Sequence, residues 1–179
     1  MAKVPSKITP SYLENAALHY LERFASSSAN LRRVLLRKVD RSVGHWGGER
    51  TDHVGQVDAT IEKLSRLGYL NDAAYAEAKV RALHRAGKGS RTIRATLAAK
   101  GVGGELTAVA LDQLAEDVPE PDLAAAIRLA KKRRLGPFRR ENRDDMRNKD
   151  LAALARAGFG FDICRKVIEA DSAEALEDA

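Results

Sequence analysis

The sequence predicts an all-α protein made of three tandem three-helix repeats that form an elongated, curved body. Three observations lead to this prediction. Apolar residues recur at i, i+3 and i+4 spacing with no alternating strand pattern of useful length. Alanine, leucine and charged residues that favour helices dominate the chain, and only 5% of residues are aromatic. A similar short segment also returns about every 60 residues.

The first repeat is predicted over residues 12–70, after a flexible N-terminal tail at 1–11. Ser11 is the expected N-cap of its first helix, with Glu14 three residues later as in a capping box. The stretch Arg41–Asp52 contains three glycines and no apolar period, so it is expected to be a mobile loop.

The second repeat is predicted over residues 71–118. Asn71 or Asp72 is expected to cap its first helix, and Ser90 its second. Gly101 is expected to end that second helix, since glycine tolerates the left-handed conformation of a C-terminal cap.

The third repeat is predicted over residues 119–169, after a break marked by Pro119 and Pro121. Four consecutive basic residues, Lys131–Arg134, close its first helix, where cations suit the helix dipole. The remaining residues, 170–179, are expected to form a frayed acidic C-terminal tail.

The repeated segments are Leu31–Lys38, Ile93–Lys100 and Leu151–Arg156. Each is a short basic amphipathic helix in second place within a set of three. Chance similarity between amphipathic helices is the alternative explanation. Repetition of a helical unit predicts a long continuous surface, and such surfaces bind extended partners.

The charge of the chain favours an anionic partner. The formal net charge is +6 and the isoelectric point is about 9.6, which attracts nucleic acid, an anionic membrane or an acidic protein surface. A basic but inert surface is the alternative. Aromatic side chains are scarce near the basic clusters, so base-specific recognition is expected to be weak. The side chains expected to bind a partner or nucleic acid are Arg32, Arg33, Arg37, Lys38, Arg81, Arg85, Lys88, Arg91, Arg94, Lys131, Lys132, Arg133, Arg134, Arg139 and Arg140.

Catalytic and metal-binding patterns are not found in the sequence. It contains no phosphate-binding glycine loop and no Cys/His metal spacing, so no enzyme activity, cofactor or metal is predicted. His45 and His53 lie in the expected loop, where a solvated histidine is favoured over weak metal capture. The single cysteine, Cys164, is expected to be a structural thiol, although Arg165 and Lys166 nearby could lower its pKa.

The cysteine content and the lack of long apolar stretches also bear on the cellular location. One cysteine cannot form an internal disulfide, and no stretch approaches the roughly 20 apolar residues of a membrane span. The N-terminus also has no apolar core of signal-peptide length. A cytoplasmic protein that does not enter a membrane is predicted.

Several motifs along the chain resemble the regulatory protein RecX family. They are Leu31–Lys38 after a serine-rich turn, Leu64-Ser-Arg-Leu-Gly-Tyr-Leu-Asn-Asp72, Tyr75–Glu77, Gly87–Ser90 with Ile93-Arg94, Leu97 and Lys100-Gly-Val102, Lys149–Leu154, and Arg156-Ala-Gly-Phe-Gly-Phe-Asp162. The similarity covers roughly residues 12–168. The individual helices are not specific, whereas the Leu-Gly-Tyr-Leu-Asn-Asp and Gly-Phe-x-Phe-Asp stretches are.

The resemblance implies three tandem three-helix units and a modulator of the RecA recombinase. Members of that family bind the RecA–single-stranded-DNA filament, lie in its groove and restrain filament growth, ATP hydrolysis and strand exchange, and they are not enzymes. The expected partners are therefore the RecA filament and its single-stranded DNA, bound by a monomer. Two alternatives stay open. One is an independent nucleic-acid-binding protein that uses its short helices as helix-turn-helix readers. The other is an enzyme with a hidden site around Cys164.

Overall fold

The computed structural model describes residues 4–177, and every regular element within that range is a helix. The helices are α1 Pro10–Leu21, α2 Ser28–Trp46, α3 Thr51–Arg66, α4 Asp72–Arg85, α5 Ser90–Ala99, α6 Gly104–Asp117, α7 Pro121–Arg133, η1 Gly136–Phe138 (3-10), α8 Arg143–Arg156, α9 Phe161–Ile168 and α10 Glu174–Glu177. The all-α prediction is confirmed. Among the described residues, no helix combines the length and the apolar character needed to cross a membrane.

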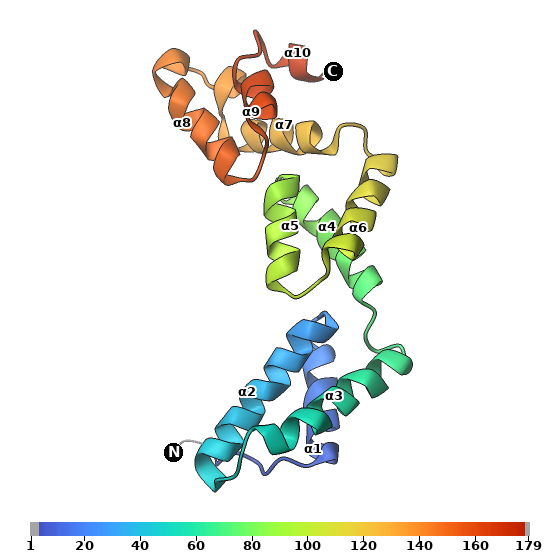
Figure 1. Ribbon diagram of the computed structural model, residues 1–179. Helices are drawn as coiled ribbons and strands as arrows, with labels where there is room; N and C mark the ends of the chain where they lie inside the picture. The colour runs from blue at the N-terminus through green and yellow to red at the C-terminus, as the bar shows by residue number, and fades with distance from the viewer. Residues whose placement is uncertain (1–3, 178–179) are drawn as a thin grey trace. The chain divides into compact units, whose positions relative to one another are not determined.

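The chain divides into two compact units. The first contains residues up to Tyr75 together with Lys100–Val102, and the second contains Ala76–Ala99 and the residues from Gly103 onward. In the first unit, α1, α2 and α3 pack pairwise against one another (Figure 1). Their shared core is apolar and buried, and it consists of Leu13, Ala17, Leu31, Leu35, Leu36, Val39, Val57, Leu64 and Leu70.

The second unit has an apolar core in each of its two halves. In its first half α5 packs on α6, and the buried residues are Ala76, Val80, Ile93, Leu97, Ala110, Leu111 and Leu114. In its second half α9 packs on both α7 and α8, with Phe159 and Leu154 among the residues that are almost completely buried. These helices bury one stripe each, as the spacing of their apolar residues predicts.

The start of the first helix differs from the prediction. Thr9, not Ser11, is the N-cap, because its hydroxyl accepts a hydrogen bond from the backbone N–H of Tyr12 at 3.1 Å. Pro10 is then the first helical residue, a position where proline costs no hydrogen bond. Residues 10 and 11 of the predicted tail are therefore helical, and residues 1–3 lie outside the described part of the chain.

The loop predicted over Arg41–Asp52 is largely wrong, because α2 continues through Trp46. Ser42 is buried and Val43 packs against the core, so the inward-facing stripe of α2 extends into this stretch. The irregular part begins at Gly47 and Gly48, whose φ angles of 81° and 97° end the helix.

The end of the chain is also more ordered than predicted. Residues Glu174–Glu177 form α10, and Leu176 is 5% exposed within the apolar core of the second unit. The Arg143 guanidinium donates hydrogen bonds to the carbonyls of Ile168, Ala170 and Asp171, which fixes the segment between α9 and α10. The final two residues of the predicted tail, 178 and 179, lie outside the described residues.

A carboxylate from the next set of helices caps α2. The backbone N–H of Ser28 donates to Asp72 Oδ1 at 2.7 Å, and the Ser27 hydroxyl donates to the Lys100 carbonyl at 2.5 Å. Asn71, rather than Asp72, caps α4, since its side chain accepts from Ala74 N at 3.0 Å. The side chain of Asp72 is therefore available to accept the hydrogen bond from the N-terminus of α2.

The same arrangement recurs inside the second unit. Ser90 donates through its backbone N–H to Asp122 Oδ1 at 2.8 Å and through its hydroxyl to Asp122 Oδ2 at 2.7 Å. Gly89 N donates to the Ala157 carbonyl at 2.9 Å. Ser90 is thus the first residue of α5 and not its acceptor cap as predicted. In both units, an aspartate near the start of one helix satisfies the N-terminus of another, where a negative charge also complements the helix dipole.

Candidate functional site

The basic side chains of the first cluster lie on α2. Arg33 and Arg37 are exposed, and Lys38 is half-buried. Arg32 is engaged within the protein, because its Nε and Nη2 atoms donate to Asp58 of α3 at 2.5 and 3.1 Å. Those hydrogen bonds hold the pKa of Asp58 below its usual value, so the carboxylate stays ionised and neutralises Arg32.

The second cluster lies around the turn between α4 and α5. Arg81 is paired with Asp117 of α6 at 2.6 Å, whereas Arg85 is exposed and Lys88 is half-buried. Arg91 and Arg94 are both exposed on α5, three residues apart and therefore on the same side of the helix.

The third cluster lies at and beyond the C-terminal end of α7. Lys131, Lys132, Arg133 and Arg134 are all exposed, and so is Arg140. Within the described part of the chain, neither a carboxylate nor any other partner engages the side chains of Lys132, Arg133, Arg134 and Arg140. Among residues 4–177, Lys132, Arg133, Arg134 and Arg140 form the densest group of uncompensated positive charge.

Arg139 differs from its neighbours because it binds a buried carboxylate. Its Nε and Nη2 atoms each lie 2.7 Å from an oxygen of Asp150, and Gly136 N donates to Asp150 at 2.9 Å. Asp150 is 1% exposed. Burial alone would raise the pKa of Asp150, but hydrogen bonds from Arg139 and Gly136 and the charge of Arg139 outweigh it, and the pKa is lowered. Arg139 therefore has a structural role, which the sequence reading missed because Asp150 carries no local signal of burial.

Arg134 occupies a backbone conformation that usually belongs to glycine. Its φ and ψ are both 55°, and Leu135 N donates to the Ala130 carbonyl at 2.9 Å, which closes the C-terminal turn of α7. The C-terminal end of α3 has the same hydrogen bond. There Gly68 takes the left-handed conformation, and Tyr69 N donates to the Leu64 carbonyl, five residues earlier, at 2.9 Å. A non-glycine residue in this conformation costs roughly 1 kcal/mol. A strained residue that also carries an uncompensated charge is a candidate for a functional role.

Replacing Arg134 by glycine is expected to raise the free energy of unfolding by about 1 kcal/mol, because glycine adopts the left-handed conformation without strain. Urea denaturation followed by circular dichroism measures this. Arg133→Gly is the matched control: it removes the same charge from the last helical residue and is expected to lower the free energy of unfolding by about 0.5–1 kcal/mol. Equal effects of the two substitutions would contradict the role assigned to the Arg134 backbone.

Cys164 does not have the surroundings of a nucleophile. The side chain is 1% exposed, and burial raises the pKa of its thiol. A reactive cysteine needs the opposite, an accessible thiol with a lowered pKa. His45 and His53 lie on α2 and α3 rather than in a loop. No group of three or more His, Cys, Asp or Glu side chains among the described residues could hold a metal ion.

The chain is similar in sequence and in fold to known proteins of one family. Residues 71–111 match the family model described as the second three-helix domain of RecX. The regulatory protein RecX of Myxococcus xanthus is 49% identical over 173 residues, which cover 96% of this chain and 91% of that protein. The regulatory protein RecX of Agrobacterium fabrum is 34% identical over 179 residues, with 98% and 93% covered. The crystal structure of RecX from Lactobacillus salivarius superimposes with a TM-score of 0.67 at 26% identity, covering 89% of this chain and 94% of that one.

Proposed function

Since the chain belongs to the RecX family of regulatory proteins, we propose that it inhibits the RecA recombinase by binding the RecA–single-stranded-DNA filament, and so modulates DNA repair and recombination. It acts as a monomer in the cytoplasm, by binding and without catalysis. The observation that carries the proposal is the basic segment Lys131–Arg134 with Arg140, whose exposed cations suit a phosphate backbone.

We further propose that α1–α3, α4–α6 and α7–α9 are three copies of one unit. The two aspartate caps support this, because Ser28 with Asp72 and Ser90 with Asp122 occupy corresponding places in the helix order. Repeated units place corresponding helices at regular intervals along the chain, which suits a partner that is itself a repeating filament.

The direct test of the function is RecA-dependent ATP hydrolysis on single-stranded DNA with this protein titrated in. The hydrolysis rate is expected to fall with increasing protein, and affinity for the assembled filament is expected to exceed that for bare DNA. Unchanged hydrolysis at every ratio would disprove the proposal. Tight, sequence-dependent binding to duplex DNA without any recombinase would instead favour an independent helix-turn-helix-like nucleic-acid-binding protein.

Replacing Lys132, Arg133 and Arg134 together by alanine is expected to weaken filament binding about tenfold at physiological salt. The slope of log affinity against log salt should also become shallower by about 2, because each lost phosphate contact on a single strand contributes roughly 0.7. Fluorescence anisotropy with a labelled oligonucleotide inside the filament measures both quantities.

The matched control removes the same amount of charge from elsewhere. Arg23, Arg66 and Arg156 are exposed and lie outside the three clusters, so their joint replacement by alanine lowers the net charge equally. The control should leave the salt slope nearly unchanged. If both triple variants alter the slope to the same extent, net charge and not the α7 segment governs binding.

A further inference from the structure

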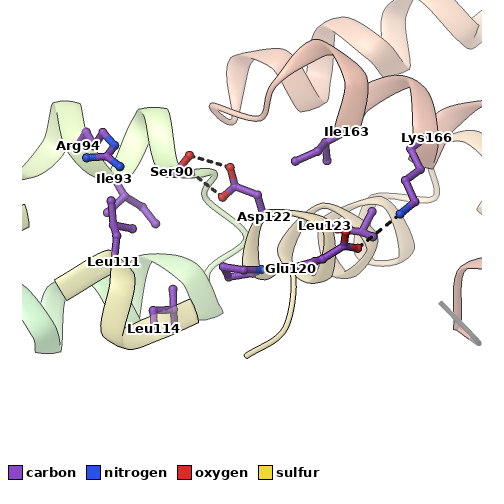
Figure 2. Close-up of a pocket in the computed structure, with 11 residues that line it drawn as sticks. Ser90, Ile93, Arg94, Leu111, Leu114, Glu120, Asp122, Leu123, Ile163 and Lys166 are labelled. Atoms are coloured by element: carbon purple, nitrogen blue, oxygen red, sulfur yellow. Dashed lines mark hydrogen bonds and ion pairs between the residues drawn. The ribbon is translucent and has the colours of Figure 1, made fainter. Parts of the chain in front are cut away.

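The second unit contains an apolar pocket bounded by α5, α6, α9 and the start of α7. Its volume is about 340 Å³, within the range of ligand-binding pockets. Figure 2 shows Ile93 from α5, Leu111 and Leu114 from α6, and Ile163 from α9 around this space. The apolar lining is aliphatic, with no aromatic side chain among the residues around the pocket.

The charged groups around the pocket are compensated with one exception. Both oxygens of Asp122 are occupied by Ser90, and Lys166 pairs with Glu120 at 3.4 Å (Figure 2). Arg94 is exposed, and no other residue within 4–177 engages its guanidinium. The pocket therefore combines an apolar interior with one uncompensated cation at its edge.

The first unit indicates which group an arginine at this position binds. Arg32 follows Ser28 by four residues, just as Arg94 follows Ser90, and both serines begin a helix that an aspartate caps. Arg32 forms two hydrogen bonds with the Asp58 carboxylate of α3. Around Arg94 the neighbouring helix α6 presents Leu111 and Leu114 instead. Arg32 therefore has a carboxylate partner within the protein, whereas Arg94 has none among residues 4–177.

We propose that this pocket docks an acidic segment of the recombinase, which inserts one apolar side chain between α6 and α9 and places a carboxylate on Arg94. This rests on the proposed function and names a contact within it. A protein segment fits this pocket better than a nucleotide does. Proteins that bind single-stranded nucleic acid stack the bases on aromatic rings, and the pocket has no aromatic side chain in its lining. Arginine also binds carboxylates through two parallel hydrogen bonds, as Arg32 does with Asp58.

Two substitutions test the pocket through binding to the RecA filament assembled on an oligo-dT strand. Ile163→Asp places a negative charge in the pocket wall, and Arg94→Glu reverses the exposed cation without touching the core. Each is expected to lower filament affinity at least tenfold, and to change affinity for the bare oligo-dT strand no more than a control that changes the net charge by the same amount. Val109→Asp and Arg156→Glu are the matched controls, since both positions are exposed and outside the pocket. The controls should bind the filament like the wild type.

A photoreactive benzoylphenylalanine at position 163 provides the direct readout. It is expected to crosslink to an Asp- and Glu-rich peptide of the recombinase, identified by mass spectrometry. Normal filament affinity of Arg94→Glu, or a crosslink to DNA alone, would overturn the pocket proposal while the proposed function stands. A wild-type protein that does not bind the filament would overturn both.

Discussion

Replacing Gly158 by alanine is expected to destabilise the second unit by about 3 kcal/mol, as the sum of backbone strain and steric overlap. Gly158 has a φ of 96°, a conformation that L side chains rarely adopt. A Cβ atom there would also overlap Thr92 Oγ1 and lie 2.5 Å from Thr92 N. The backbone of α5 would therefore have to shift to make room for this Cβ atom. Such a shift would disturb the hydrogen bond from Gly89 N to the Ala157 carbonyl.

Gly160→Ala is the matched control two residues away. Gly160 is the N-cap of α9 with a φ of −65°, and no atom lies within 4 Å of the position its Cβ would take. This substitution should leave the free energy of unfolding within about 0.5 kcal/mol of the wild type. Urea denaturation compares the two variants, and hydrogen exchange should show the loss of protection in α5, α8 and α9. Similar unfolding curves for Gly158→Ala and Gly160→Ala would contradict the close backbone packing at Gly158.

Replacing Asp150 by alanine is expected to lower the free energy of unfolding by about 3 kcal/mol, because it leaves a partly buried guanidinium without its partner. The Arg139 side chain is 23% exposed, so water compensates it only in part. The N–H of Gly136 also loses its acceptor. Asp112→Ala on the exposed face of α6 is the control and should change stability by less than about 0.5 kcal/mol. A loss for Asp150→Ala no larger than that of the control would show that the ion pair does not contribute.

The same carboxylate makes stability depend on pH in the acidic range. The pKa of Asp150 in the folded protein lies below its unfolded value of about 3.9. Its stabilising contribution is therefore complete at neutral pH and is lost as the pH falls from about 4 through the folded pKa. Unfolding curves of the wild type and Asp150→Ala should converge below that range. A constant difference between them from pH 7 to pH 2 would disagree with a lowered pKa.

Much of the helical order was predictable because its causes are local. Apolar spacing predicted an all-helical chain, and Gly101 was expected where α5 ends. The errors occurred where a local signal competed with packing. The glycines after Arg41 suggested a loop, but the burial of Ser42 and the packing of Val43 carry α2 to Trp46.

The candidate site was predictable only as a set of charges. Sequence identified the basic residues, but an arginine that is paired looks the same in sequence as one that is not. The structure separates Arg32, Arg81 and Arg139, which bind Asp58, Asp117 and Asp150, from Arg94 and Arg134, whose charges are uncompensated among residues 4–177.

The sequence by itself determined the all-helical class, the basic segments and the family, since helical periodicity and short motifs are properties of neighbouring residues. Only the tertiary structure decided which carboxylate meets which cation or helix end. Asp72 and Asp122 cap helices 44 and 32 residues away, and Asp150 neutralises Arg139 across 11 residues. Such partners are brought together by burial of the apolar stripes, so their identity depends on how the helices pack and not on local spacing.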